Sequence, residues 1–486
     1  MELSKDLRSR QEVRELAEQA TVAAKALAAM EQEQLDRIVK AVADAGFAHA
    51  EELAELAVQE TGFGRVDHKI IKNQFASRTV WEAIRDQKTI GILRRDEQKK
   101  LWDVGVPVGV IAGIAPSTNP TSTVLYKSLI ALKGGNAIIF SPHPGAKSCT
   151  RRAVEIVTEA ARSAGCPDGA VSCITLPTMD AVDELMKHPQ VRLILATGGG
   201  AMVKAAYSSG KPAIGVGAGN GPAYLHPSCD LDRALDDIFF SKTFDNGTIC
   251  ASEQSILCEK AMAGQVRDGL RRRGGYLLSK EEAAQLSKLI LRCSGTMNPA
   301  IVGKSAGQIA AMAGLCDAAR QATILIAEQQ EVGREHPYSR EKLCPILALY
   351  EVENEQQALS MAQVILQQEG SGHTFVIHAA DTQVIETFAR RVPVSRFLVN
   401  TPAALGGIGG TTNLFPALTL GCGAVGGSSS SNNIGPLDLI NIRRVAWGVR
   451  DIAAPDGHTT KEAPADDEAL ISAVMARLLE KIGDRS

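Results

Sequence analysis

The stretch that decides the fold begins with Val108-Gly109-Val110-Ile111-Ala112. This apolar run predicts a buried strand, residues 121–133 have the pattern of a helix, and Ala137-Ile138-Ile139-Phe140 predicts a second strand. Two parallel strands need a crossover of a dozen or more residues, and that crossover is usually a helix. The stretch therefore predicts a βαβ unit, in which both strands belong to one parallel sheet with helices on its faces.

The same alternation continues toward the C-terminus. It predicts strands at residues 171–176 and 193–196 and helices at 146–164, 179–187 and 201–208. After Asp230 the second half of the chain repeats the alternation of strands and helices and has its own predicted core. The predicted helices are at 231–241, 262–273, 281–291 and 356–367, and the predicted strands are at 255–258, 323–326, 346–350, 374–377 and 397–400. The predicted fold class is α/β, and ligands are expected at the carboxyl ends of the strands.

The N-terminal part has a helical pattern up to about Thr61, with apolar residues at spacings of three and four. We expect Gly46 to interrupt this pattern and Gly62 and Gly64 to end it, and a third helix covers residues 67–83. We interpret these helices as a layer packed on a sheet and assign no chemistry to them. Residues 89–106 predict a hairpin with a charged turn at 94–100.

Beyond residue 400 the pattern changes. Residues 401–433 are dense in Gly, Thr and Ser and predict a loop, and residues 434–445 predict a return to strand and helix. Residues 455–467 predict a polar linker. In residues 468–482, Ile471, Met475, Leu478 and Ile482 recur at spacings of four, three and four, which predicts a short amphipathic helix.

The composition is that of a soluble globular protein. The chain has 486 residues, 45% of them hydrophobic and 22% charged, which predicts about three domains. Its net charge of −3 gives no reason to expect nucleic acid or an anionic membrane as a partner. The charged start predicts no secretory signal, and the longest nearly uncharged run, residues 104–131, is interrupted by prolines and is not a membrane span. The ten cysteines show no metal-ligand spacing, so we expect no metal and a reducing cytosol.

Two residues are candidates for catalytic roles, and Cys250 is the candidate nucleophile. Cys250 follows the turn signal Asp245-Asn246-Gly247, and such a turn can hold a thiol at the lip of a cleft. The alternative is a small buried hydrophobic residue, which is the commoner role of a lone cysteine. Asn119 lies just beyond the strand at residues 108–112, and the alternative there is a simple Asn-Pro turn.

Glycine runs give one candidate phosphate or nicotinamide contact. Thr197-Gly198-Gly199-Gly200 ends a predicted strand and opens a helix, so its backbone N–H groups can face a ligand. The run from Gly421 to Gly426 satisfies G-x-G-x-x-G, but serines follow it instead of a helix. It therefore fails the structural context of a dinucleotide-binding fingerprint, and we interpret it as loop.

Phe244-Asp245-Asn246-Gly247-Thr248-Ile249-Cys250-Ala251-Ser252-Glu253-Gln254 resembles the active-site segment of the CoA-acylating aldehyde dehydrogenases. The resemblance covers about residues 1–450. It implies an aldehyde dehydrogenase fold: a Rossmann-like NAD-binding domain at residues 1–88 and 107–227, an α/β catalytic domain at 228–424, and an oligomerisation arm formed by the hairpin at 89–106 with residues 425–452. A linker at 453–467 and an amphipathic helix at 468–486 would follow.

The resemblance also implies roles for individual residues. Cys250 would be the nucleophile, and Asn119 with the Cys250 backbone N–H would hold the oxyanion. Glu341, in a Glu-x-x-x-Pro segment, would bind the nicotinamide ribose, although a lone glutamate is usually a solvated charge. The cofactor contacts would come from two loops: Ser141 and His143 toward the adenosine part of NAD or CoA, and Thr197, Gly198 and Gly199 toward the cofactor. His143 could equally be a surface loop residue.

One departure from the family pattern is informative. Hydrolytic members carry a Glu-Leu-Gly-Gly-Lys segment whose glutamate activates water, whereas the matching stretch here begins with Val216. Without a positioned base, water attacks a thioester slowly, which favours CoA as acceptor. We predict reversible oxidation of a short-chain aldehyde, propionaldehyde first and acetaldehyde next, to its acyl-CoA with NAD (NADP being possible). The alternatives are an acyl-phosphate reductase of the same superfamily and a catalytically silent binding or scaffold protein.

The resemblance extends to partners. We expect a homodimer or homotetramer in the cytoplasm. The C-terminal helix resembles the encapsulation peptides that direct enzymes into bacterial microcompartments, so shell proteins are expected partners. The alternative is a helix that docks on its own subunit.

Overall fold

The structure is a computed structural model that describes residues 4–292, 295–450 and 471–477. The described residues form two compact units: one contains residues 4–90 together with 106–292 and 295–441, and the other contains residues 91–105, 442–450 and 471–477. The candidate site described below belongs entirely to the first unit.

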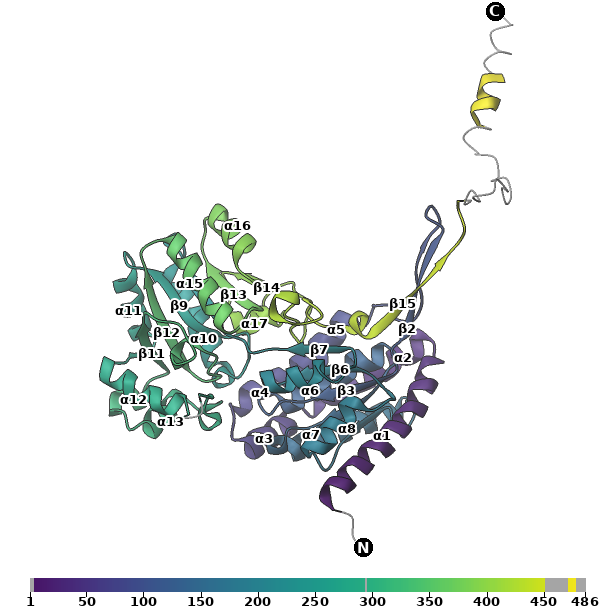
Figure 1. Ribbon diagram of the computed structural model, residues 1–486, viewed down its shortest axis with the longest axis horizontal. Coiled ribbons are helices and arrows are strands. Elements are labelled where there is room, and N and C mark those ends of the chain that lie inside the picture. Colours follow the sequence, from purple (N-terminus) through teal and green to yellow (C-terminus); the bar gives the residue numbers. More distant parts are fainter. Residues whose placement is uncertain (1–3, 293–294, 451–470, 478–486) are drawn as a thin grey trace, which may run out of the picture. The chain divides into compact units, whose positions relative to one another are not determined.

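The N-terminal helices begin the first unit (Figure 1): α1 Lys5–Ala28, α2 Gln32–Ala48, α3 Ala50–Thr61, α4 Val66–Gln74 and α5 Val80–Ile84. A π-helical turn, Phe75–Thr79, joins the last two into the continuous helix expected at residues 67–83. Gly62 ends α3 with φ of 65°, as expected. The prediction for Gly46 is wrong, since this residue lies inside α2. A Cβ there would come within 2.8 Å of the Leu125 side chain, so close packing outweighs the poor helix propensity of glycine.

The first sheet has five parallel strands in the order β5-β4-β3-β6-β7. They are β3 Val110–Ile114, β4 Ala137–Ser141, β5 Val171–Cys173, β6 Val191–Thr197 and β7 Ala213–Val216. The helices between them are α6 Pro120–Lys133, α7 Lys147–Ser163, α8 Met179–Lys187 and α9 Gly200–Tyr207. The strand order reverses between β3 and β6, which is where doubly wound sheets bind dinucleotides. The α/β prediction is confirmed.

The second sheet has seven parallel strands in the order β10-β11-β12-β9-β8-β13-β14 (Figure 1). They are β8 Gly221–Leu225, β9 Glu253–Glu259, β10 Gly275–Leu277, β11 Ile324–Gln329, β12 Ile346–Val352, β13 Gly372–His378 and β14 Val394–Val399. Its helices are α10 Leu231–Thr243, α11 Ala263–Arg272, α12 Lys280–Ile290, α13 Ala306–Met312, α14 Asp317–Arg320, α15 Glu355–Gln368, α16 Thr382–Arg391 and α17 Ala403–Gly407. The sequence patterns did not identify β7, β8 or β10, and the expected loop at residues 401–433 contains α17.

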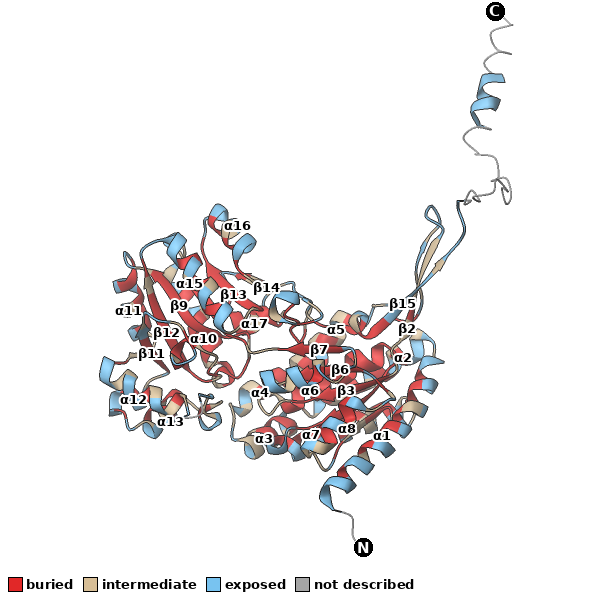
Figure 2. Cartoon of the chain, in the orientation of Figure 1, coloured by how far each residue is buried: buried red, intermediate tan, exposed pale blue. Residues whose placement is uncertain are grey.

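Burial follows from this layered arrangement. The strands of both sheets are largely buried (Figure 2), because helices cover both faces of a parallel sheet. Most of the helices are buried on one side, whereas α6 is buried along its whole length. In α1 the buried apolar residues recur every three or four positions, with Ala23 and Ala24 adjacent: Val13, Ala17, Ala20, Ala23, Ala24 and Leu27.

The second unit contains a three-stranded sheet in the order β1-β2-β15. Strands β1 Gly91–Asp96 and β2 Leu101–Pro107 form the expected hairpin, whose turn is shorter than predicted because β1 continues to Asp96. Strand β15 covers Ile440–Ala446, and the Trp102 and Trp447 rings meet edge to face at 4.9 Å. A role in oligomerisation stays a prediction, as do the predicted domain boundaries.

Residues 471–477 are helical and exposed. The predicted linker at 453–467 and the rest of the predicted C-terminal helix lie outside the described residues. Within the part of the chain that the structure describes, no helix is both long and apolar enough to cross a bilayer.

Candidate active site

A cavity of about 350 Å³ lies where strands of the first sheet end and strands of the second begin. Residues 116–119 follow β3 and residues 197–199 begin at the last residue of β6, at the reversal of strand order, whereas Cys250 and Glu341 precede β9 and β12. All the predicted site residues except Ser141 line the cavity: Asn119, His143, Thr197, Gly198, Gly199, Cys250 and Glu341. Residues chosen from five separate segments of the sequence thus come together: three segments lie at the carboxyl ends of strands of the first sheet, and two lie just before strands of the second.

Cys250 follows a sharp left-handed turn. Asp245, Asn246 and Gly247 have φ of 49°, 51° and 73°, a region that few residues other than Asn, Asp and Gly adopt. The turn ends the helical stretch after α10 and leaves Cys250 half-buried in the cavity wall. Burial raises the pKa of the Cys250 thiol to about 12, and the Glu341 carboxylate adds to the effect. The thiol is therefore protonated at rest near neutral pH.

Asn119 lies directly before Pro120, the first residue of α6. Its Nδ2 donates to the Thr248 carbonyl at 3.3 Å and to Thr118 Oγ1 at 3.2 Å. Both distances are at the long end of the range for hydrogen bonds, so a stronger acceptor that arrives near Cys250 can take over one of these N–H groups. An amide donor beside a cysteine is the arrangement that stabilises an oxyanion.

A buried cluster of charges supports Asn119, and sequence reasoning missed it. Lys69 and Lys72 of α4 both donate to Asp245 Oδ2, Lys69 at 3.0 Å. Burial lowers the pKa of Lys72 to about 8. Burial opposes ionisation of Asp245 as well, but Lys72 and Lys69 outweigh it and lower the pKa of this carboxyl to about 2.

The N-terminal helices therefore reach the cavity, although no chemistry was assigned to them. Lys72 lines the cavity, and Lys69 also donates to the Thr118 carbonyl at 2.9 Å. A signal was present in the sequence: residues 69 and 72 share one helix face with Asn73, also buried, which places polar groups where a core-facing helix normally has apolar ones.

Two predicted cofactor residues carry buried hydroxyl groups without partners. Ser141 Oγ and Thr197 Oγ1 lie at the last residues of β4 and β6. A Cβ on Gly199 or Gly200 would meet no atom within 4 Å, so the space in front of the α9 N-terminus is open. Unpaired buried donors and an open glycine turn at the reversal of strand order fit a dinucleotide.

His143 has an ordinary structural partner. It is exposed, its Nδ1 accepts the Gly145 N–H at 3.1 Å, and it caps the 3₁₀ turn Pro144–Ala146. Partial burial lowers the pKa of this imidazole. The neutral ring still lines the cavity, beside the loop that follows β4.

Glu341 is tied to the segment that follows β7. Its Oε1 accepts the Gly219 N–H at 2.8 Å, and its own N–H donates to Glu369 Oε2 at 2.8 Å. Burial raises the pKa of Glu341 to about 8, and the nearby Glu369 carboxylate adds to the effect. The carboxyl group is therefore mostly protonated near neutral pH and can donate as well as accept hydrogen bonds.

Val216 is the last residue of β7, is buried, and lines the cavity. Among the described lining residues Glu341 is the one carboxylic acid, and the Gly219 N–H holds it. The position expected for a water-activating glutamate therefore carries an apolar side chain.

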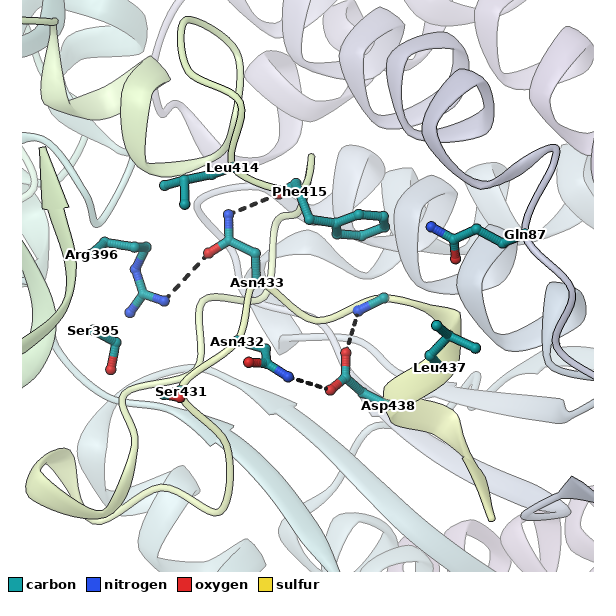
Figure 3. Close-up of a pocket in the computed structure, with 11 residues that line it drawn as sticks. Gln87, Ser395, Arg396, Leu414, Phe415, Ser431, Asn432, Asn433, Leu437 and Asp438 are labelled. Atoms are coloured by element: carbon teal, nitrogen blue, oxygen red, sulfur yellow. Dashed lines mark hydrogen bonds between the residues drawn. The ribbon is translucent and has the colours of Figure 1, made fainter. Parts of the chain in front are cut away.

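A larger cavity, about 690 Å³, lies elsewhere in the first unit (Figure 3). Buried Arg396 contributes to its wall and donates to the Gly421 carbonyl at 2.7 Å and to Asn433 Oδ1 at 3.4 Å. Its lining contains no cysteine and none of the predicted site residues: it consists of Gln87, Ser395, Arg396, Leu414, Phe415, Ser431, Asn432, Asn433, Gly435, Leu437 and Asp438. The smaller cavity is therefore the candidate active site.

A dinucleotide-type sheet that faces a half-buried cysteine and an amide donor defines a class of thiol-dependent dehydrogenases. The chain belongs to the aldehyde dehydrogenase family, whose model matches residues 5–277. It is 45% identical over 440 residues to the bifunctional aldehyde-alcohol dehydrogenase AdhE of Escherichia coli, covering 90% of this chain and 49% of the relative. It thus spans about half the length of that relative. It is 34% identical to the succinate-semialdehyde dehydrogenase (acetylating) of Clostridium kluyveri, covering 91% and 97% of the two chains.

Solved structures agree with this assignment. A probable aldehyde dehydrogenase from Listeria monocytogenes is 59% identical with a TM-score of 0.91, covering 92% of this chain and 99% of that one. An acetylating aldehyde dehydrogenase from Geobacillus thermoglucosidasius is 50% identical with a TM-score of 0.90, covering 92% and 98%. A propionaldehyde dehydrogenase from the fucose utilisation microcompartment of Clostridium phytofermentans is 29% identical with a TM-score of 0.81, covering 90% and 97%.

Proposed function

We propose that this chain oxidises a short-chain aldehyde to its acyl-CoA with NAD⁺, through a thioester on Cys250. One observation carries the proposal. A single cavity contains a cysteine and an amide donor, and the position of the water-activating base is occupied by Val216. The Geobacillus and Clostridium relatives named as acetylating enzymes support the same reaction.

The reaction begins at the sulfur atom. Cys250 Sγ releases its proton to solvent and adds to the aldehyde carbon, and Asn119 Nδ2 with the Cys250 N–H hydrogen-bonds the resulting oxyanion. A preorganised donor of this kind contributes about 3–4 kcal/mol to transition-state stabilisation. Bound NAD⁺ supplies the hydride acceptor. The loop residues Thr197, Gly198 and Gly199, with Glu341, would hold its nicotinamide half, and Ser141 and His143 would contact the adenosine half.

The second half of the reaction is a thiol exchange. The acyl group remains on Cys250 Sγ as a thioester until the CoA thiol attacks its carbonyl carbon, takes the acyl group and returns a proton to Cys250. The bond broken and the bond formed are both thioesters, so the reverse direction, acyl-CoA reduction, is accessible.

The aldehyde we propose first is propionaldehyde, and acetaldehyde is second. The wall of the cavity includes Ile408, Leu418 and Leu420, which suit a short apolar chain better than a charged one. The Clostridium phytofermentans relative is named for propionaldehyde. NAD is the first candidate cofactor and NADP the second.

The decisive experiment measures acyl-CoA from an aldehyde panel with each cofactor and CoA. Without CoA we expect about one NADH per active site and then a stop, because Val216 cannot activate water. Cys250→Ser should form no acyl-CoA while keeping its fold and NAD affinity, since serine has no adjacent base here. Acyl-CoA from the pure serine variant would refute the role of Cys250. Faster NADH oxidation with acyl phosphate than with acyl-CoA would favour the reductase alternative.

We further propose a homodimer or homotetramer built through the arm, and targeting to a microcompartment shell through the C-terminal segment. Ile471, Val474 and Met475 are 61%, 51% and 56% exposed, so their apolar surface is free to meet a partner groove. Met475→Asp should stop co-purification with shell proteins, whereas Ala473→Asp, about half a turn away, should not.

Deletion of residues 455–486 should leave kcat, KM and oligomeric state unchanged. Dissociation or inactivation of the truncated enzyme would instead indicate a helix that docks on its own oligomer.

A further inference from the structure

Lys72 occupies an unusual position for a lysine. It is buried in α4, which packs against α6, and it lines the catalytic cavity. Its Nζ donates to Asn119 Oδ1 at 2.6 Å, to Thr248 Oγ1 at 2.9 Å and to Asp245 Oδ2. An ammonium group has three donors, and all three are used by protein acceptors.

The bond to Asn119 determines which way its amide faces. An amide has one oxygen end and one nitrogen end, and the oxygen end is held by a cation. Nδ2 must then lie on the opposite side, where its bonds to Thr248 and Thr118 are the long ones. The amide cannot flip without placing an NH₂ group against the Lys72 ammonium. Lys72 therefore presents Asn119 as a donor.

The cluster also has a net positive charge. Asp245 is shared by Lys69 and Lys72, so one carboxylate balances two ammonium groups. The Asp245 side chain itself is fixed by the Arg65 N–H at 2.8 Å and by Thr248 Oγ1 at 2.6 Å. A fixed positive charge behind a donor strengthens its bond to an anion, most of all in a site with little water.

We propose that Lys72 is a positioning residue for the oxyanion: it fixes the Asn119 amide with its N–H groups toward the cavity and polarises them. Since its own three donors are occupied, Lys72 acts through Asn119 and does not touch the substrate. This inference rests on the proposed function, in which Asn119 binds the oxyanion.

The test is a double-mutant cycle on the full-length enzyme, with the single-turnover rate of Cys250 acylation by propionaldehyde as readout. Asn119→Ala should lower this rate about 100- to 1,000-fold. Lys72→Met should lower it about 10- to 100-fold, with the Kd for NAD unchanged. In the Asn119→Ala background Lys72→Met should have almost no further effect, because the residue through which it acts is gone.

Lys69→Met is the matched control. It removes the same charge and another bond to Asp245, but Lys69 does not contact Asn119. Its effect on the rate should be smaller than that of Lys72→Met, because the Lys72 hydrogen bond that fixes the Asn119 amide remains. If Lys72→Met does not fold, Lys72→Gln, which keeps a donor without the charge, should give an intermediate loss that also disappears in the Asn119→Ala background.

Two results would overturn the inference. One is a Lys72→Met effect that multiplies in full with that of Asn119→Ala, and the other is a folded Lys72→Met enzyme with the wild-type acylation rate. Failure of the proposed function looks different, since the wild-type enzyme itself would then show no aldehyde-dependent NADH.

Discussion

Gly219 lies directly against the backbone of Cys250. A Cβ placed on Gly219 would come to 1.8 Å from the Cys250 carbonyl oxygen and 3.1 Å from the Cys250 Cβ. The N–H of the same glycine donates to Glu341 Oε1. The segment after β7 therefore approaches Cys250, the proposed nucleophile, as closely as two backbones can, and any side chain at Gly219 must displace Cys250.

Gly219→Ala should lower kcat/KM about 100-fold or more, because a displacement of about 1 Å at a reacting atom has effects of this size. The measurement is kcat/KM for propionaldehyde together with the melting temperature. Gly264→Ala is the control, since a Cβ there meets no atom within 4 Å. A folded Gly219→Ala enzyme with normal kcat/KM would contradict this packing.

Glu341→Gln should make Cys250 more reactive toward iodoacetamide. The Glu341 carboxylate contributes, after burial, to the raised pKa of the thiol. Glu341 has a pKa of about 8, so its charge is present mainly above that pH. Removing a negative charge favours the thiolate, so the alkylation rate of the variant should exceed that of the wild type most clearly above about pH 8. Equal rates at all pH values would show that burial alone determines the pKa of Cys250.

Val216→Glu should divert part of the acyl-enzyme to free acid. Val216 lines the cavity from the end of β7, so a carboxylate there can reach a water molecule near the thioester. Burial raises the pKa of such a carboxyl group, which makes the carboxylate a better base. The ratio of free acid to acyl-CoA measures the diversion, and Val216→Gln controls for size and polarity. A variant whose crystal structure shows the carboxylate facing Cys250, yet which releases no free acid, would refute this account of CoA dependence.

Glu253→Gln should change how stability depends on pH. Glu253 is buried at the start of β9, its Oε2 has no hydrogen-bond partner, and burial raises its pKa from 4.5 to about 7. Between these two pH values the unfolded chain releases this proton and the folded protein keeps it, so the free energy of unfolding falls as pH rises, by on the order of 3 kcal/mol.

The glutamine variant cannot release this proton and should lack that loss. Relative to wild type it should gain stability between about pH 5 and about pH 8, as measured by denaturant unfolding. Glu55→Gln, at an exposed position, controls for the removal of a carboxylate. A constant difference between Glu253→Gln and wild type over this range would show that Glu253 ionises normally in the folded protein.

Local patterns predicted most of the fold. The apolar runs at 108–112 and 137–140 became β3 and β4, because a strand buried on both faces needs apolar residues throughout. Strands β7 and β8 were not predicted, because residues 212–222 contain several glycines and two prolines, which are local turn signals. Pairing with neighbouring strands, which no local rule contains, makes those residues strands.

The sequence predicted those site residues whose candidate role can be recognised from one short segment of the chain. Cys250 and Asn119 each follow a recognisable turn or strand end. The Lys72–Asp245 contact joins residues 173 positions apart, and a lysine on an N-terminal helix is normally an exposed charge. The shared helix face of Lys69, Lys72 and Asn73 could be seen in the sequence, but its position beside Cys250 is seen only in the folded chain.

That separation along the chain has a consequence for folding. Lys69 and Asp245 are 176 residues apart, so their contact closes a very long loop and requires that both sheets be in place. Until then Asp245 lacks its counter-ions, and the turn before Cys250 lacks the groups that anchor it. We therefore expect the enzyme to become active when these long-range contacts form, and not when the core of either sheet forms. In a refolding experiment the return of activity should lag behind the return of secondary structure, which makes the active site a sensor of complete tertiary assembly.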